Sequence, residues 1–186
     1  SCSKDLLKGS LELARELQLK LHIHVAETQA ENGMILERYG KRPLAFLKEL
    51  GYLEHEGIFA HGVELNEREI AELTASKIHI AHNPISNLKL ASGIAPVTDL
   101  IQAGVTVGLA TDSVASNNNL DMFEESRTAA LLQKMRTGDV TQFIIEQALK
   151  TMTIEGAKAL GMDDQIGSLE VGKQADFLII QPKGKV

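Results

Sequence analysis

The hydrophobic positions of this chain follow two alternating patterns. Short runs rich in Val, Ile and Ala are typical of buried strands, and longer stretches with apolar residues at helical spacing are typical of amphipathic helices. We expect strands at residues 20–26, 57–61, 77–81 and 105–110, and helices at 4–17, 29–39, 43–50, 66–75, 95–103 and, as three segments, 120–160. This alternation predicts an α/β fold with parallel strands joined by right-handed crossovers.

Capping residues mark the ends of several predicted helices. Ser3 is a good N-cap, and Asn66 with Glu69 three residues later matches a capping box. The stretches 82–93 and 111–119 are rich in Asn and Ser, so we expect loops there.

The last part of the chain has a different pattern. Residues 165–180 are typical of two short strands around a turn at Gly172. A hairpin after a run of helices predicts a small β element, separate from the alternating part.

Composition narrows the class of protein. The 186 residues carry a formal charge of −6 without a Lys/Arg run, which argues against nucleic-acid binding. No apolar run approaches the roughly 20 residues that span a bilayer, so we expect no membrane partner. The single cysteine, Cys2, fits a reducing compartment, and the polar first ten residues do not resemble a signal peptide. We therefore expect a cytoplasmic protein.

Histidine and carboxylate side chains lie at the ends of the predicted strands. The first strand ends with His24 and Glu27, the second with His61, the third with His79 and His82, and the fourth with Asp112. In β/α barrels, active sites lie at this carboxyl end of the strands. A single histidine in an apolar strand is more often a packed core residue, but four successive strand ends favour a functional site.

These residue types suit metal-assisted hydrolysis. Neutral imidazole and carboxylate oxygen bind zinc or a similar divalent ion, and a catalytic site keeps one position for water. Asp112 fits the roles of ligand and general base, Glu27 that of a proton shuttle, and His61 that of a polarising hydrogen-bond partner.

The residues at the strand ends lie in four longer segments. The segments are His22-Ile-His-Val-Ala-Glu-Thr28, Ala60-His-Gly-Val63, His82-Asn-Pro-Ile-Ser-Asn-Leu-Lys-Leu90 with Gly93-Ile-Ala-Pro96, and Thr111-Asp-Ser-Val-Ala-Ser-Asn-Asn-Asn-Leu-Asp121. They resemble the amidohydrolase superfamily, closest to the branch of chlorohydrolases and 5-methylthioadenosine/S-adenosylhomocysteine deaminases. The spacings of 37 residues from His24 to His61 and 51 from His61 to Asp112 also fit this branch.

The resemblance implies a role for each residue. His24 resembles the metal ligand on barrel strand five, and Glu27 resembles the carboxylate that contacts the purine and shuttles a proton. His61 resembles the strand-six residue that hydrogen-bonds the nucleophile or the substrate. Asp112 resembles the strand-eight metal ligand and general base. The implied cofactor is a divalent metal, Zn²⁺ first and Fe²⁺ as the alternative.

The implied function is metal-dependent deamination of an adenosine-type nucleoside by the full-length protein. The substrate would contact Glu27, His61 and Asp112. One alternative is another superfamily reaction, such as chlorotriazine or guanine-type hydrolysis. The other is an inactive fragment that serves only as an assembly unit.

Departures from the family pattern define which part of the barrel this is. The His-x-His pair of strand one has no counterpart here, because Glu27 places His22-Ile-His24 on strand five. We therefore expect residues 1–161 to form the C-terminal half of a (β/α)8 TIM barrel, strands five to eight, and residues 162–186 to begin a small β-sandwich. With two of about four ligands, the chain alone is not expected to bind metal tightly. Two exposed strand edges predict a homo-oligomer.

Overall fold

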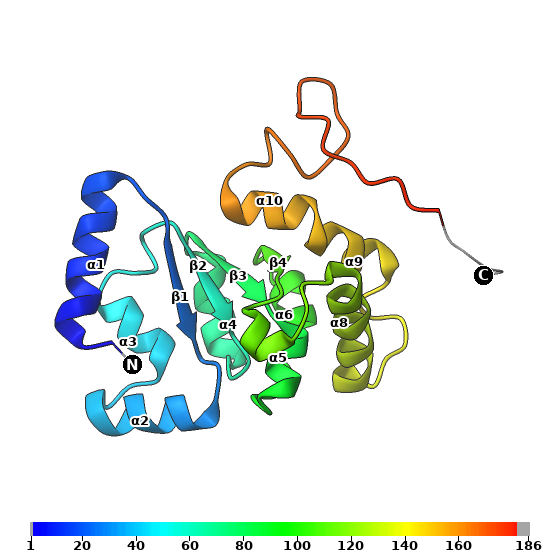
Figure 1. Ribbon diagram of the computed structural model, residues 1–186. Coiled ribbons are helices and arrows are strands. Elements are labelled where there is room, and N and C mark those ends of the chain that lie inside the picture. Colours follow the sequence, from blue (N-terminus) through cyan, green and yellow to red (C-terminus); the bar gives the residue numbers. More distant parts are fainter. Residues whose placement is uncertain (1, 182–186) are drawn as a thin grey trace.

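The computed structural model describes residues 2–181 and contains one parallel sheet of four strands, in the order β1-β2-β3-β4 (Figure 1). The strands are β1 (Leu21–Val25), β2 (Gly57–His61), β3 (Ile78–His82) and β4 (Val107–Leu109). The helices are α1 (Lys4–Leu17), α2 (Gln29–Tyr39), α3 (Pro43–Glu49), α4 (Glu67–Thr74), α5 (Pro84–Lys89), α6 (Val97–Gln102), α7 (Val114–Asn117), α8 (Met122–Thr137), α9 (Ile145–Met152) and α10 (Ile154–Leu160). The predicted α/β class and parallel strands are confirmed, as are all the predicted helices.

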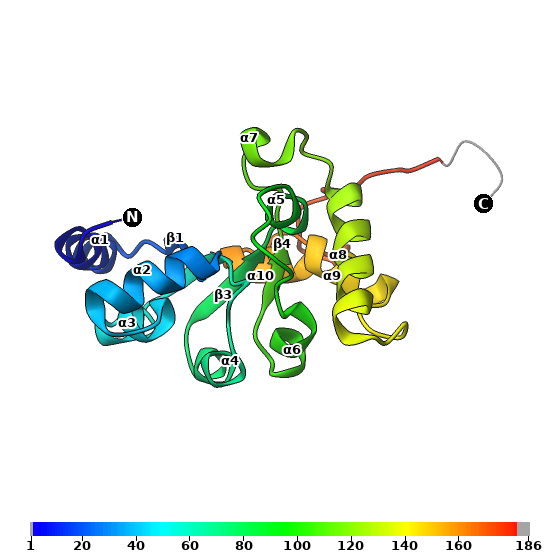
Figure 2. The same ribbon diagram turned by 90° about the horizontal axis from the view of Figure 1, so that it is seen from below.

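The two faces of the sheet have different surroundings. On one face, Phe59, Ile80 and Val107 are buried in a core shared with α1, α3, α4 and α6. Figure 2 shows α3, α4 and α6 along this face, with α5 and α7 on the other side near the carboxyl ends of the strands. On that other face, which we call the inner face, His22 and His24 of β1 are exposed. The sheet thus has a covered outer face and a partly open inner face.

Helix α10 covers the inner face beside β4. A Cβ atom added at Gly108 would lie 3.0 Å from the Cα atom of Gly156, so the backbones of β4 and α10 pack directly together. The Lys20 ammonium, just before β1, donates a hydrogen bond to the carbonyl of Ala159 at 3.1 Å. Figure 1 shows α10 at the end of the sheet opposite to the arrowheads. The carboxyl ends of the strands are therefore left to α5, α7 and the polar side chains.

Two segments predicted as loops contain short helices. Residues 82–93 include α5, which begins at Pro84, and residues 111–119 include α7, which ends before Asn118 at φ 84°. Proline suits the first turn of a helix because its φ is already helical and it needs no hydrogen-bond acceptor. The buried side chains of α5 include the polar Ser86 and Asn87, so it lacks the apolar period that predicts a helix.

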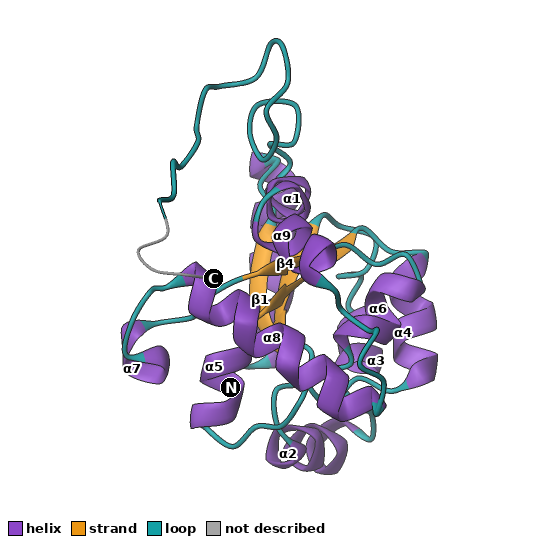
Figure 3. Ribbon diagram, turned by 90° about the vertical axis from the view of Figure 1, so that its right-hand side faces the viewer, coloured by secondary structure: helices purple, strands orange, loops and turns teal. Residues whose placement is uncertain are grey.

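The predicted strands at residues 165–180 are not formed. This part is turns and extended chain that projects beyond the helices and strands, as the upper loop in Figure 3 shows. Strands need a ladder of hydrogen bonds to a neighbour, whereas within residues 2–181 two backbone bonds, from Gln174 to Gln165 and from Lys173 to Glu170, join the two predicted halves. Leu169, Val171 and Phe177 are exposed here. The boundary at residues 161/162 and the start of a β-sandwich stay predictions, and residues 182–186 lie outside the described residues.

In the described part of the chain, no helix combines the length and the apolar character needed to cross a membrane.

The capping box of α4 gives a stability prediction. The Asn66 side chain accepts from the Glu69 amide at 3.0 Å, and the Glu69 carboxylate accepts from the Asn66 amide at 3.1 Å. Asn66→Ala is expected to lower the free energy of unfolding by about 1 kcal/mol, measured by urea denaturation. Thr74→Ala, at the exposed other end of α4, is the control, with an expected change below about 0.5 kcal/mol. Equal effects of the two substitutions would contradict the capping role.

Candidate active site

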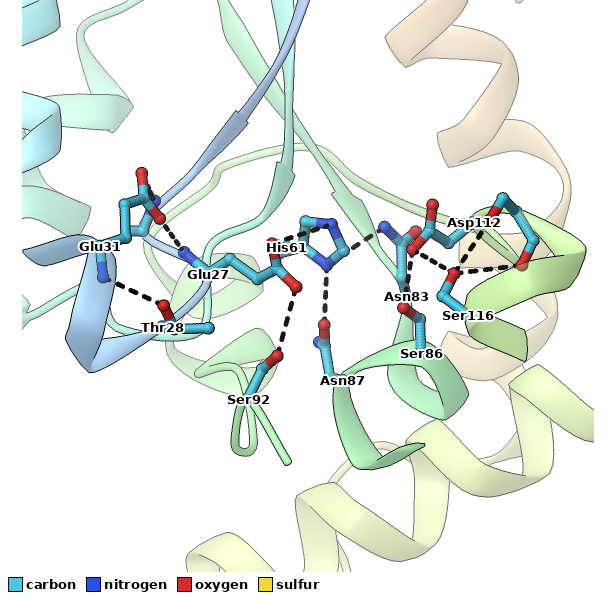
Figure 4. Close-up of polar contacts among 12 residues, drawn as sticks. Glu27, Thr28, Glu31, His61, Asn83, Ser86, Asn87, Ser92, Asp112 and Ser116 are labelled. Carbon is cyan, nitrogen blue, oxygen red and sulfur yellow. Dashed lines mark hydrogen bonds and ion pairs between the residues drawn. The ribbon is translucent and has the colours of Figure 1, made fainter. Parts of the chain in front are cut away.

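The backbone turns sharply where each site strand ends. Ala26, His61 and Asp112 have φ angles of 52°, 74° and 61°, in the left-handed region that non-glycine residues seldom adopt. Such conformations persist when surrounding contacts hold them, and they cluster at functional sites. The turns place side chains from three strands at the same end of the sheet, as Figure 4 shows.

His61 is the centre of this group. It is 1% exposed, and its ring stacks on that of His24 with centroids 5.1 Å apart. Its Nδ1 lies 2.8 Å from Asn87 Oδ1, and its Nε2 lies 3.9 Å from Glu27 Oε2. Because an amide oxygen only accepts, the Asn87 contact requires the proton on Nδ1, whereas the Asn83 side-chain amide nitrogen, 3.5 Å from the same atom, donates only to an unprotonated Nδ1. In either tautomer Nε2 is the nitrogen that faces the Glu27 carboxylate.

Glu27 is held by the start of α2. The Glu31 carboxylate accepts hydrogen bonds from the backbone amides of Ala26 at 3.2 Å and Glu27 at 2.7 Å. Thr28 in turn caps α2 by accepting from the Glu31 amide at 3.1 Å. The Glu27 carboxylate itself accepts from the Ser92 hydroxyl at 3.3 Å and is 23% exposed. A fixed backbone thus presents a partly accessible carboxylate to His61.

Asp112 follows β4 and is bound by two hydroxyls. Ser86 of α5 and Ser116 of α7 each donate to its Oδ2 at 2.7 Å. Burial acts to raise the pKa of Asp112, but the hydrogen bonds from Ser86, Ser116 and the Ser113 backbone, with His61 nearby, lower it overall. The group is therefore ionised, which is the form that binds metal or accepts a proton.

His82 lies at the end of β3 but is fully enclosed. It is 1% exposed, and neither ring nitrogen has a hydrogen-bond partner within residues 2–181. Burial, with a smaller contribution from nearby His61, lowers the pKa of His82 to about 3. The ring is therefore neutral at physiological pH.

This buried histidine makes stability depend on pH. The folded-state pKa is below the unfolded value of 6.5, so the unfolded chain binds more protons once the pH falls below 6.5. We expect His82 to remove about 2 kcal/mol of stability between pH 7 and pH 5. Urea denaturation at both pH values should show a correspondingly smaller loss in His82→Gln and His82→Leu. The same loss in all three proteins would contradict the buried neutral state.

The structure thus brings some predicted residues together and leaves others apart. His24, Glu27 and His61 are adjacent, and Asp112 joins the same end through α5. His79 is the second residue of β3 and is half-buried, so it does not lie at the carboxyl end of the strand, where the sequence pattern placed it. The sequence pattern did not indicate the polar partners of the site. Pro84, which suits the first turn of a helix, could have indicated α5 and its serine. No local sequence feature indicates that Ser92 contacts the site. The missed partners are Glu31, Ser86, Ser92 and Ser116.

The fit to a metal ion is partial. The imidazole of His24 and the carboxylate of Asp112 are the donor types that zinc prefers. However, the described residues contain no group of three or more His, Cys, Asp or Glu side chains that could hold a metal ion. Zinc sites in enzymes use three protein ligands, so these residues do not complete one by themselves.

Comparison with known sequences places the chain in a family. The model of the amidohydrolase family matches residues 1–186. Proteins named 5-methylthioadenosine/S-adenosylhomocysteine deaminase from Bacillus thuringiensis (strain Al Hakam) and Bacillus cereus (strain G9842) are each 50% identical over 185 residues. The match covers 100% of this chain and 42% of each relative, so the chain spans less than half the length of these proteins.

Solved structures agree with this family assignment. An adenosine deaminase from Xanthomonas campestris with bound zinc has a TM-score of 0.92 and 42% identity, covering 95% of this chain and 40% of that one. Atrazine chlorohydrolase TrzN from Arthrobacter aurescens TC1, complexed with zinc, has a TM-score of 0.86 and 30% identity, covering 94% and 38%. The guanine deaminase of E. coli has a TM-score of 0.82 and 28% identity, covering 93% and 40%. Together with the match over its whole length, these likenesses show that the chain belongs to the amidohydrolase family.

Proposed function

We propose that the complete protein carrying this chain is a metal-dependent aminohydrolase acting on an adenosine-type nucleoside, 5′-methylthioadenosine or S-adenosylhomocysteine. The observation that carries the proposal is the placement of Glu27, His61 and Asp112 at one end of the sheet, with 3.9 Å between Glu27 Oε2 and His61 Nε2. The substrate class is supported by the 50% identity to deaminases with that name.

The metal in this proposal is zinc, with ferrous iron as the alternative. His24 and Asp112 would be two of its ligands, and the others would come from outside residues 2–181. When bound, such an ion supplies a water molecule whose pKa is lowered to about 7. The zinc in the Xanthomonas campestris and Arthrobacter aurescens structures supports this choice.

The side chains divide the proton transfers of hydrolytic deamination. The Asp112 carboxylate accepts the proton of the attacking water, and the Glu27 carboxyl group donates a proton to the ring nitrogen beside the reacting carbon. His61 Nε2 lies at the Glu27 end of the site and hydrogen-bonds the attacking oxygen. The ring carbon gains the water oxygen, and the proton on Asp112 passes to the amino nitrogen, so that the carbon–nitrogen bond breaks to release ammonia. The remaining hydroxyl proton returns to Glu27 as the ring carbonyl forms.

The architecture belongs to the same proposal. The strands are strands five to eight of a (β/α)8 barrel, residues 1–161 form its C-terminal half, and residues 162–186 begin a β-sandwich. The sheet order and the TM-scores support this numbering. In the chain by itself β1 and β4 are the edges of the sheet, which supports the proposal that this chain forms a homo-oligomer. We also propose that the protein is cytoplasmic.

A second candidate is hydrolysis of a chlorotriazine or of guanine. It is favoured by the TM-scores of 0.86 and 0.82 to atrazine chlorohydrolase and guanine deaminase. A third, an inactive chain that acts only in assembly, agrees with the incomplete metal ligand set among the described residues.

A substrate panel separates these candidates. The complete, zinc-loaded protein is assayed for ammonia from 5′-methylthioadenosine, S-adenosylhomocysteine and guanine, and for chloride from atrazine. We expect ammonia from one or both adenosine compounds, with kcat/KM at least about tenfold above guanine and atrazine. Turnover of guanine or atrazine alone would replace the substrate assignment, and no turnover would support the assembly role.

A further inference from the structure

Glu125 is a buried carboxylate that joins three helices. It lies on α8 and is 0% exposed. Its Oε2 accepts a hydrogen bond from the backbone amide of Ile85 on α5 at 3.2 Å, and its Oε1 accepts from the side-chain amide of Asn117 on α7. One side chain therefore contacts both of the short helices that the sequence pattern did not predict, beside Lys89, which joins α5 to Ala115 and Asn118, and Asn117, which also binds the Thr111 carbonyl.

The two residues that Glu125 binds are each next to a serine of the site. Ser86 follows Ile85, and Ser116 precedes Asn117. Both hydroxyls donate to the same oxygen, Oδ2 of Asp112, at 2.7 Å (Figure 4). The Asp112 Oδ1 atom accepts no side-chain hydrogen bond within residues 2–181. The serines thus distinguish the two oxygens of one carboxylate.

The chemistry of Glu125 indicates more than packing. Both of its contacts are donated by N–H groups and accepted by the carboxyl oxygens. Burial raises the pKa of Glu125 overall, and the hydrogen bonds from Ile85 and Asn117 oppose this only in part. No salt bridge to Glu125 is formed in the described part of the chain. A buried carboxyl group without a cation beside it costs stability, which favours a role for Glu125 beyond packing.

We propose that Glu125 is a positioning residue: it fixes α5 and α7 so that Ser86 and Ser116 hold Asp112 Oδ2 and leave Oδ1 for the reacting group. The role of Asp112 rests on the proposed function. The geometry of the contacts among Glu125, Ser86, Ser116 and Asp112, which we call the clamp, does not. Glu125 touches no reacting atom and acts only through the two serines.

The geometry is tested by crystal structures of variants of this chain. In Glu125→Gln an amide NH₂ faces one of the two donors, so we expect at least one serine Oγ to lie beyond 3.5 Å from Asp112 Oδ2. Asn117→Ala should release Ser116 and keep Ser86 in place. Glu124→Gln is the matched control, because Glu124 is the exposed neighbour of Glu125 and binds Asn119. Unchanged serine contacts in both Glu125→Gln and Asn117→Ala would overturn the proposal.

The functional consequence is tested in the complete protein by a double-mutant cycle. Glu125→Gln and the pair Ser86→Ala with Ser116→Ala should each lower kcat about tenfold or more, with KM within about twofold. Combining all three substitutions should give no further loss, because Glu125 acts through the serines. Multiplied losses would overturn the proposal, since a general structural role is independent of the hydroxyls.

The crystal structures and the activity assays can contradict the proposal independently of each other. A protein without deaminase activity would contradict the proposed function, and the crystal structures would still decide the clamp. If Glu125→Gln does not fold, Asn117→Ala and the serine pair carry both tests: Asn117→Ala with Ser116→Ala must then lose no more activity than Ser116→Ala alone, and a larger loss overturns the proposal.

Discussion

Asp112→Asn is expected to lower the kcat of the complete protein by about 10³-fold or more. The amide cannot accept the proton of the attacking water and is a weaker metal ligand than a carboxylate. The hydrogen bonds of Ser86 and Ser116 to Asp112 lower the pKa of that carboxyl group, so the wild-type protein holds the reactive form at neutral pH. Steady-state ammonia release measures the effect.

The amide keeps the shape of Asp112, and therefore the fold. The far-UV circular dichroism spectrum should match that of the wild type. The free energy of unfolding from urea denaturation should agree with the wild-type value within about 1 kcal/mol. Asp163→Asn, an exposed aspartate in the turn after α10, is the matched control and should keep wild-type kcat. If Asp112→Asn retained more than about a tenth of the activity, neither the base nor the ligand role could stand.

Glu27→Gln is expected to lower kcat by about 10²- to 10³-fold with a smaller change in KM. Glutamine keeps the volume and the acceptor for the Ser92 hydroxyl but cannot donate and recover a proton. The defect should therefore lie in the chemical step. Single-turnover kinetics measures that step directly.

The control for Glu27 is Glu37→Gln, an exposed glutamate on α2. It should leave the single-turnover rate unchanged. Equal rates for Glu27→Gln and wild type would remove Glu27 from the proton transfers. A raised KM with unchanged kcat would assign it to substrate binding alone.

The strand ends of the site could be predicted from the sequence. The period and the length of the apolar runs predict β1 to β4. The carboxyl ends of parallel strands lie at one edge of the sheet. Glu27 follows β1 and His61 ends β2, so their proximity follows from topology, and the 3.9 Å contact confirms it. The whole-chain match to the family confirms the resemblance read from the motifs.

The short helices α5 and α7 could not be read from hydrophobic spacing. Ser86 and Asn87 are buried because they bind Asp112 and His61, so polar residues of α5 face inward and no apolar period distinguishes the helix from the expected loop. Glu125 is equally hidden in the sequence, since it stands beside Glu124 like one of a pair of surface glutamates. Only the tertiary contacts of Glu125 with Ile85 and Asn117 distinguish this buried glutamate from its exposed neighbour.

The tail shows the opposite case, in which a local pattern is present without its structure. Residues 165–180 alternate as strands do, yet a strand forms only against a neighbour. Exposed Val171 and Phe177 show that the described chain provides no sheet for them.

The most direct test of the central claim, hydrolysis at one site formed by Glu27, His61 and Asp112, is an isotope measurement. The complete zinc-loaded protein is incubated with 5′-methylthioadenosine or S-adenosylhomocysteine in ¹⁸O-labelled water, and the nucleoside product is analysed by mass spectrometry. The account predicts one ¹⁸O atom per product, equimolar ammonia, and loss of both in Asp112→Asn. Product without ¹⁸O, or labelled product at the wild-type rate from Asp112→Asn, would contradict it.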